Sequence, residues 1–304
     1  MIKTEIYEQA LFETIKRGAT VISDDVKEAF EAAIKRESNP DAKNGLMATL
    51  RSMEMSAKRE NPLCVDTGWP IFYFKVGNQC ELEGGFVELE NAARRAVAKA
   101  TKKGYLRATM KHPLTGYDPG NNIGMNIPDF TYQFVDGNGI EITYAAKGGG
   151  SECFGGTRHR MIAFADGIKG IEKFVIDSFV ASARAGAVCP PSVLGIGIGG
   201  DFEQVAEMAK RALMIPLDEN NPDSFYAELE QELLAQRADA DELMIQLDEA
   251  YTTLSEDFLA NEDQEAELRQ QIMEAQAEGV GIRTLMAPDH IELDKEGKTA
   301  GSGA

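Results

Sequence analysis

A stretch of 78 residues without glycine, 201–278, constrains the fold of this chain more than any other feature. No proline lies between Pro222 and Pro288, and the leucine and aromatic residues of the stretch mostly recur three or four positions apart. That spacing places them on one face of a helix. We therefore expect a long helical hairpin or coiled-coil-like arm, broken near Asn261, before a disordered tail.

The C-terminal part is also strongly acidic. Residues 216–304 contain 23 Asp and Glu against 5 Lys and Arg, so they carry 18 of the 19 net negative charges of the chain. A chain of this charge repels the phosphate backbone, so we expect no nucleic-acid partner. We interpret the acidic segment as a solubilising or partner-facing arm, and we expect the chemistry in the nearly neutral remainder.

The chain of 304 residues, 43% of them hydrophobic, is long enough for one large packed domain or two smaller ones. Its start lacks the apolar run of a signal peptide, and no later stretch approaches the ~20 apolar residues of a membrane-spanning helix. We therefore expect a cytoplasmic protein without a membrane partner.

Helical and strand-like patterns alternate in residues 1–215. Apolar residues at helical spacing predict helices over 5–17, 24–36, 41–59, 86–103 and 168–184, and another that begins near Asp201. Apolar, β-branched and aromatic runs predict strands at 71–76, 130–135, 140–146 and 192–198. The Asp-Gly-Asn-Gly turn at 136–139 predicts that the second and third strands form a hairpin, and the proline- and glycine-rich residues 113–128 are expected to be a loop.

These patterns predict an α/β protein with N-terminal helices, then a mixed sheet layered with helices, then the acidic helical arm. We divide the chain into an N-terminal helical region packed on the core (1–60), a catalytic-type α/β core (61–215), and the arm with its tail (216–304). No internal repeat is visible.

Two loops of the core combine residues suited to chemistry. In Cys64-Val65-Asp66-Thr67-Gly68, a carboxylate follows a thiol by two residues just before a strand, which suggests a ligand or an acid/base group. Taken alone, the motif is better explained by a half-buried cysteine beside a turn. The loop 147–156 holds five glycines, and such a loop usually brings backbone N–H groups close to an anion or a cofactor. A wide turn is the alternative.

Two further places lie near the expected last strand. In Cys189-Pro190-Pro191, paired prolines hold a thiol rigidly, although burial alone could account for the cysteine. The glycines of 195–200 precede a helix and could bind an anion. As a dinucleotide fingerprint they are weak, because no strand with an acidic end follows. A nucleotide-binding module stays open here as a minor alternative.

The metal-binding potential lies in four widely separated cysteines. No CxxC or HExxH motif occurs and the three histidines are scattered, so a zinc site is not expected. Without disulfides, iron–sulfur ligation is the expected metal use of the thiols Cys64, Cys80, Cys153 and Cys189.

Three motifs together resemble a known family. Cys-x-Asp-Thr-Gly before a strand, Lys-Gly-Gly-Gly-Ser-Glu, and Cys-Pro-Pro-x-x-x-Gly-x-Gly-Ile-Gly-Gly stand in the order and spacing of the α subunit of iron–sulfur hydro-lyases. That family comprises the two-subunit class I fumarases and the L(+)-tartrate dehydratases, and the resemblance covers about residues 40–235. It implies a [4Fe–4S] cluster and reversible hydration of a small dicarboxylate, with fumarate and malate the expected pair.

The resemblance also implies residue roles. Cys64 and Cys189 would be cluster ligands, Asp66 a catalytic group beside the substrate, and Arg107 a carboxylate clamp. The glycine loop Gly148, Gly149 and Gly150 would lie against the substrate. The base and further substrate arginines belong to a β part that is absent from this sequence, so a β subunit is the expected partner in a hetero-oligomer.

This chain departs from the family at three places. The family has a third cluster cysteine after the position of Cys189, where this chain has none; Cys153 is the expected substitute and Cys80 the alternative. Val65 and Gly116 stand where the family often has Gln and Arg. These departures leave two alternatives to fumarate hydration: an L(+)-tartrate dehydratase subunit, or a non-catalytic binding or assembly homologue that has lost the cluster.

Overall fold

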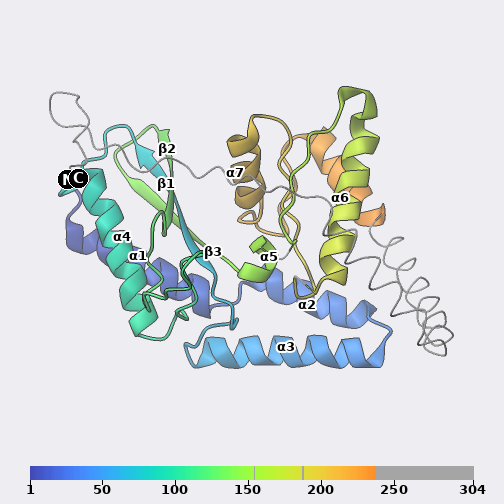
Figure 1. The fold of residues 1–304 in the computed structure, drawn as a ribbon, viewed down its shortest axis with the longest axis horizontal. Helices are drawn as coiled ribbons and strands as arrows, with labels where there is room; N and C mark the ends of the chain where they lie inside the picture. Colours follow the sequence, from blue (N-terminus) through green and yellow to red (C-terminus); the bar gives the residue numbers. More distant parts are fainter. Residues whose placement is uncertain (154, 187, 237–304) are drawn as a thin grey trace. The chain divides into compact units, whose positions relative to one another are not determined.

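The computed structural model of the chain describes residues 1–153, 155–186 and 188–236 (Figure 1). The elements follow in the order α1 (Thr4–Thr20), α2 (Asp24–Arg36), α3 (Pro40–Lys58), β1 (Trp69–Gly77), α4 (Gly85–Lys102), β2 (Asp129–Val135), β3 (Ile140–Lys147), α5 (Gly149–Cys153), η1 (Phe164–Asp166), α6 (Gly167–Arg184) and α7 (Phe202–Ala212). Residues 224–236 are also helical. The predicted mixed α/β class is confirmed.

The strands form one mixed sheet in the order β2-β1-β3. The central strand, β1, pairs with β2 in parallel and with β3 antiparallel, so that Phe72 lies opposite both Phe130 and Tyr144. Because β1 has a partner on each side, its backbone N–H and C=O groups are satisfied within the sheet.

The predicted hairpin between 130–135 and 140–146 is wrong, because β1 lies between these two strands. Residues 136–139 cross the end of β1: the Gly77 N–H donates to the Gly139 carbonyl (2.9 Å), and the Asn78 N–H donates to the Val135 carbonyl (2.8 Å). A nearly continuous buried run makes up β1, so the central position removes the most apolar surface from water. The turn chemistry alone could not reveal the inserted strand.

The side chains of β1 alternate between two different environments, as the period of a strand requires. Phe72, Phe74 and Val76 face a core that they share with α1 and α4, which lie together on one side of the sheet (Figure 1). Ile71 and Tyr73 point to the other face, where they cluster with Ala145. This second face is the one on which the candidate site develops.

The predicted helices of residues 1–103 and 168–184 are confirmed to within a few residues, and α2 has the predicted bounds. In α4, Ala92, Ala93, Ala96 and Ala100 are fully buried, and their small side chains let α1 approach closely. Asn39 caps α3 by accepting from the backbone N–H groups of Asp41 and Ala42.

The predicted strand at 192–198 is wrong. The segment has no strand pairing and instead runs against α7, where Cβ atoms added at Gly195 and Gly197 would overlap the carbonyl oxygens of Ala209 and Val205. The glycines therefore allow backbone to pack directly on a helix, and this contact replaces a sheet neighbour. The helix itself begins as predicted, with Asp201 and Gln204 forming a reciprocal capping box.

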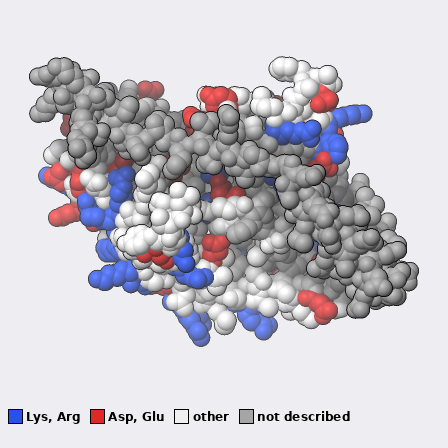
Figure 2. Space-filling view, viewed as in Figure 1, with Lys and Arg blue, Asp and Glu red and all other residues white. Residues whose placement is uncertain are grey.

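The first turns of the acidic region pack on α6. Leu229 and Leu233, both 7% exposed, form a small core with Val175. The expected arm over residues 237–304 lies outside the described residues. Within the described part, no helix is long and apolar enough to cross a membrane. On the face shown in Figure 2, Lys and Arg are interspersed with Asp and Glu.

Candidate functional site

The loop Cys64–Gly68, which precedes β1, is fastened to the segment around Arg107. The buried Thr67 hydroxyl accepts a hydrogen bond from the Arg107 backbone N–H (3.0 Å). The Arg107 guanidinium donates through Nη1 to the Val65 carbonyl oxygen (2.7 Å). Arg107 is exposed, and a guanidinium carries five N–H donors. The structure therefore places Arg107 beside the Asp66 loop with donors left for an anionic ligand.

Asn122 holds the segment around Arg107 in place, a role that the sequence did not predict. It is 1% exposed, and its Oδ1 accepts from the backbone N–H groups of Thr109 (3.0 Å) and Met110 (3.3 Å). Its Nδ2 donates to the Arg107 carbonyl (2.6 Å) and to the Thr101 hydroxyl (3.1 Å). A fully satisfied buried amide fixes the path of the chain around it. The signal available in the sequence was the Gly-Asn-Asn run, typical of a left-handed turn residue, and Asn122 has φ of 57°.

Asp66 and the glycines Gly148–Gly150 come together in the structure. The expected loop is helical over α5 (Gly149–Cys153), and we keep the name glycine loop for Gly148–Gly150 at its start. The Asp66 carboxylate accepts a long hydrogen bond through Oδ2 from the Gly150 N–H (3.4 Å). A Cβ added at Gly148 would lie 3.0 Å from the same oxygen. Gly68 adopts φ of 73°, and a Cβ there would overlap the Lys147 carbonyl group. Two motifs that lie some eighty residues apart in the sequence thus meet at one end of the sheet.

Beside the glycine loop lies a charged network that the sequence did not predict. Lys147, the last residue of β3, donates to the Ser151 hydroxyl (2.6 Å) and lies 3.7 Å from Glu152 Oε2. Lys210 of α7 reaches Glu152 Oε1 at 2.9 Å. Burial lowers the pKa of Lys147 below its usual value, while Glu152 opposes this shift and Lys210 adds to it. The network joins α7 to the loop that contacts Asp66.

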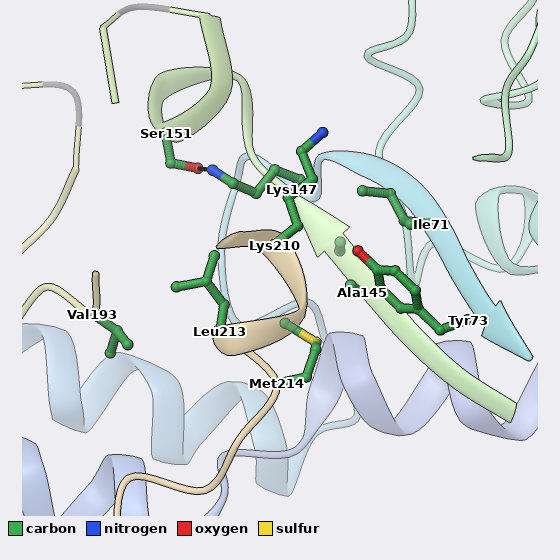
Figure 3. A pocket seen from close by; sticks show the side chains of 10 residues that line it. Ile71, Tyr73, Ala145, Lys147, Ser151, Val193, Lys210, Leu213 and Met214 are labelled. Carbon is green, nitrogen blue, oxygen red and sulfur yellow. Dashed lines mark hydrogen bonds between the residues drawn. The ribbon is translucent and has the colours of Figure 1, made fainter. Parts of the chain in front are cut away.

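A pocket of about 230 Å³ lies under this network, on the second face of the sheet (Figure 3). Its walls are apolar side chains of β1 and α7, among them Ile71 and Leu213, and the Lys147, Lys210 and Ser151 side chains line it as polar groups. Burial raises the pKa of Tyr73, which also lines the pocket, to about 12. Tyr73 therefore stays a neutral phenol at physiological pH.

The cysteines predicted as ligands are free and exposed: Cys64, Cys153 and Cys189. Cys80, the alternative third ligand, follows the end of β1, whereas Cys64 precedes its start. A nine-residue strand spans roughly 25 Å. Cys80 also packs against the core between the sheet and α1 and α4, so it does not lie where it could share a cluster with Cys64.

The chemistry of this donor set fits an iron–sulfur cluster, since exposed thiols are the ligands that such clusters take. The arrangement of the side chains does not fit such a cluster. Within residues 1–153, 155–186 and 188–236, no three Cys, His, Asp or Glu side chains are grouped so that they could hold a metal ion. The described chain supplies the thiols and not a closed ligand set.

The glycines 195–200, considered as a nucleotide site, are explained by packing. Gly195 and Gly197 allow contact with the backbone of α7, and a Cβ at Gly200 would lie 2.8 Å from the Gln204 side chain that caps the helix. The capping side chains of Asp201 and Gln204 occupy the turn that a phosphate would need.

The site as a whole can bind and orient a small anion. Arg107 provides exposed donors, and the half-buried Asp66 stands between them and a backbone made of glycine. The Arg107 guanidinium suits a carboxylate of the substrate. The Asp66 carboxylate suits a hydroxyl or a proton of the same substrate that has to be moved.

Comparison with known proteins gives one family. The family described as fumarate hydratase (Fumerase) matches residues 8–241. A protein of Methanocaldococcus jannaschii, provisionally named L(+)-tartrate dehydratase subunit alpha, is 36% identical over 224 residues, or 73% of this chain and 77% of the relative. The L(+)-tartrate dehydratase subunit alpha of Escherichia coli strain UTI89 is 30% identical over 213 residues, or 70% of this chain and 68% of that protein. The family match contains every residue of the site described above.

Proposed function

Because the chain belongs to the fumarate hydratase (Fumerase) family and is a hydro-lyase, we propose that it is the α subunit of an iron–sulfur enzyme that hydrates fumarate to malate reversibly. The observation that supports this most is the meeting of Asp66 with Gly148–Gly150, next to Arg107. These loops carry two of the motifs by which the sequence resembles the family.

The substrate would lie between Arg107 and the glycine loop. The Arg107 side chain donates one hydrogen bond to the Val65 carbonyl, which aims the guanidinium while leaving its outer N–H groups for a carboxylate. The glycines present no side chain, so a planar dicarboxylate can lie against the backbone. Asp66, held by the Gly150 N–H, stands where it can accept or return a proton at the substrate.

We propose a [4Fe–4S] cluster as cofactor, with Cys64 and Cys189 as two of its ligands and Cys153 as the third. When bound, such a cluster supplies a Lewis-acidic iron for the substrate hydroxyl. Cys64 and Cys189 lie on separate loops and Cys153 lies at the end of α5, so we expect the three thiols to form a complete ligand set only when these segments are brought together in the assembled enzyme.

A β subunit is the proposed partner, because the relatives are named as α subunits. The β subunit would provide the base that removes the proton α to the second carboxylate. We place the active site at the junction of the two chains in a hetero-oligomer.

L(+)-tartrate is the second candidate substrate, and the names of the relatives favour it. Val65 stands where the family often has Gln, and it is 74% exposed beside Arg107. Valine in place of glutamine removes a polar contact expected near the substrate, so a substrate with hydroxyl groups at other positions can be accommodated. The ratio of kcat/KM for fumarate to that for L(+)-tartrate in one preparation separates the two.

The test uses the chain purified anaerobically with its β partner. We expect Asp66→Asn to lower kcat/KM at least about 100-fold, the contribution typical of a positioned proton-transfer group, with an unchanged melting temperature. Asp136→Asn is the matched control, since Asp136 is an exposed carboxylate in the turn at the other end of the sheet. Full iron content without activity on either substrate would overturn the proposal and favour a non-catalytic assembly role.

A further inference from the structure

Glu152 connects two lysines that come from different parts of the chain. Its Oε1 lies 2.9 Å from Lys210 Nζ on α7, and its Oε2 lies 3.7 Å from Lys147 Nζ at the end of β3. The Thr157 hydroxyl lies between the same Oε2 (3.2 Å) and the Ser151 carbonyl oxygen (3.0 Å) and can donate its proton to either. Both oxygens of the carboxylate are therefore engaged, and the side chain has one defined position.

These contacts continue into the glycine loop. Lys147 donates to the Ser151 hydroxyl (2.6 Å), and that hydroxyl donates to the Gly148 carbonyl (3.0 Å). The Glu152 backbone N–H also donates to the Gly148 carbonyl (3.0 Å). The path from α7 thus runs through Glu152 and Lys147 to the backbone that lies against Asp66.

The network is more shielded than the surface ion pair between Lys173 and Asp177. The side chains of Lys147, Glu152 and Lys210 are 14%, 25% and 29% exposed, because the pocket walls and α7 cover them. The pair Lys173–Asp177 on α6 is 71% and 56% exposed at a similar distance of 2.7 Å. Shielded pairs interact more strongly than exposed ones and are expensive to break, because one charge is then left without its partner.

The glycine loop needs such support. Gly149 and Gly150 begin α5 (Gly149–Cys153), a helix of five residues that is too short to be stable by itself. Glycine destabilises a helix further because of its conformational freedom, and the hydrogen bond from Gly150 to Asp66 is long. An unsupported loop would sample many conformations, and a ligand would have to select one of them at a cost in affinity.

We propose that Glu152 and Lys210 are positioning residues that hold the glycine loop in the conformation that receives the substrate and faces Asp66. The inference deepens the proposed function, because it names the device that presents the substrate-binding backbone. Neither residue touches the substrate: Lys210 acts through Glu152, and Glu152 acts through Lys147 and Ser151.

The first test does not depend on activity. Hydrogen–deuterium exchange of the full chain is compared for wild type, Lys210→Met and Lys210→Arg, with Lys173→Met as the exposed control. We expect exchange of the peptide covering 148–153 to become about tenfold faster in Lys210→Met, to return towards wild type in Lys210→Arg, and to stay unchanged in Lys173→Met. Unchanged exchange in Lys210→Met would overturn the proposal, whatever the reaction catalysed.

The second test uses the anaerobic complex with its β partner. We expect Lys210→Met to raise the KM for fumarate about tenfold while kcat changes less than about threefold, since a loosened loop weakens substrate binding more than the chemistry. An equal fall of kcat at unchanged KM would contradict the assigned role. If Lys210→Met fails to fold, Glu152→Gln breaks the same bridge from the other side and must give the same split. Wild-type complex without activity would remove the proposed function and leave the exchange result standing.

Discussion

Two glycine-rich segments of this protein have similar compositions and opposite uses. Gly148–Gly150 leaves space that the Asp66 carboxylate partly fills, and the loop is held by side chains of β3 and α7. Gly195 and Gly197 leave no space at all, because the backbone of α7 lies where their side chains would be. A glycine cluster therefore indicates a close approach, but its partner decides whether the result is a site or a packing contact.

The largest loss of stability should come from adding a methyl group at Gly197, where the backbone packs on α7. A Cβ at Gly197 would overlap the Val205 carbonyl oxygen, which belongs to a helix backbone and cannot move aside easily. We expect Gly197→Ala to lower the free energy of unfolding by about 3 kcal/mol, as overpacking against a rigid neighbour does. Chemical denaturation measures this change in the free energy of unfolding.

Gly139→Ala is the control for that variant, since a Cβ there meets nothing within 4 Å. Gly139 and Gly197 both have ordinary backbone angles, so only the neighbour differs. Equal stability of Gly197→Ala and Gly139→Ala would mean that the segment does not lie on α7 in this way.

We expect a somewhat smaller loss of stability when Asn122, which supports the site, is replaced. Asn122→Ala removes the acceptor for the backbone N–H groups of Thr109 and Met110, which would remain buried without a partner. Leaving buried donors unsatisfied should cost about 2 kcal/mol of unfolding free energy. Activity should also fall, because the Arg107 carbonyl loses its bond to the Asn122 amide. Asn121→Ala provides a neighbouring comparison whose side chain accepts only one local bond, from the Ile123 N–H (3.1 Å).

The smallest stability effect is expected in the site loop itself. A Cβ at Gly148 would lie 3.0 Å from Asp66 Oδ2, whereas one at Gly149 would lie 3.6 Å away, an ordinary contact. We expect Gly148→Ala to shift the carboxylate and lower kcat/KM about tenfold, with melting nearly unchanged. Gly149→Ala should reduce it less. If Gly149→Ala were the more damaging change, substrate contact at Gly149 and not the position of Asp66 would control the rate.

Much of the fold followed from the sequence, since local patterns determine it. The helix over 24–36 and the apolar run at 71–76 are present, because amphipathic spacing and β-branched aromatic residues are short-range signals. The hairpin was wrong because β1, a distant part of the chain, lies between its two strands. The strand at 192–198 was wrong because the segment packs on the next helix, α7, instead of joining the sheet.

The residues of the site also divide into those that local motifs reveal and those that only the tertiary structure reveals. Asp66, Arg107 and Gly148–Gly150 stand in motifs, and the structure brings them together. Glu152 ends one of these motifs, but Asn122 and Lys210 do not stand out in the sequence, because their partners Met110 and Glu152 lie more than ten residues away from them. Only the tertiary structure shows that Lys210 on α7 meets the glycine loop.

The central claim is that the thiols of Cys64, Cys153 and Cys189 hold an iron–sulfur cluster in the assembled enzyme, and iron and acid-labile sulfide per α chain in the anaerobic complex test it most directly. We predict about four of each per chain, lost in Cys64→Ala and in Cys189→Ala and retained in Cys80→Ala, whose thiol lies beyond the other end of β1. A folded wild-type complex with no iron, or with iron that Cys64→Ala and Cys189→Ala leave in place, would contradict the account.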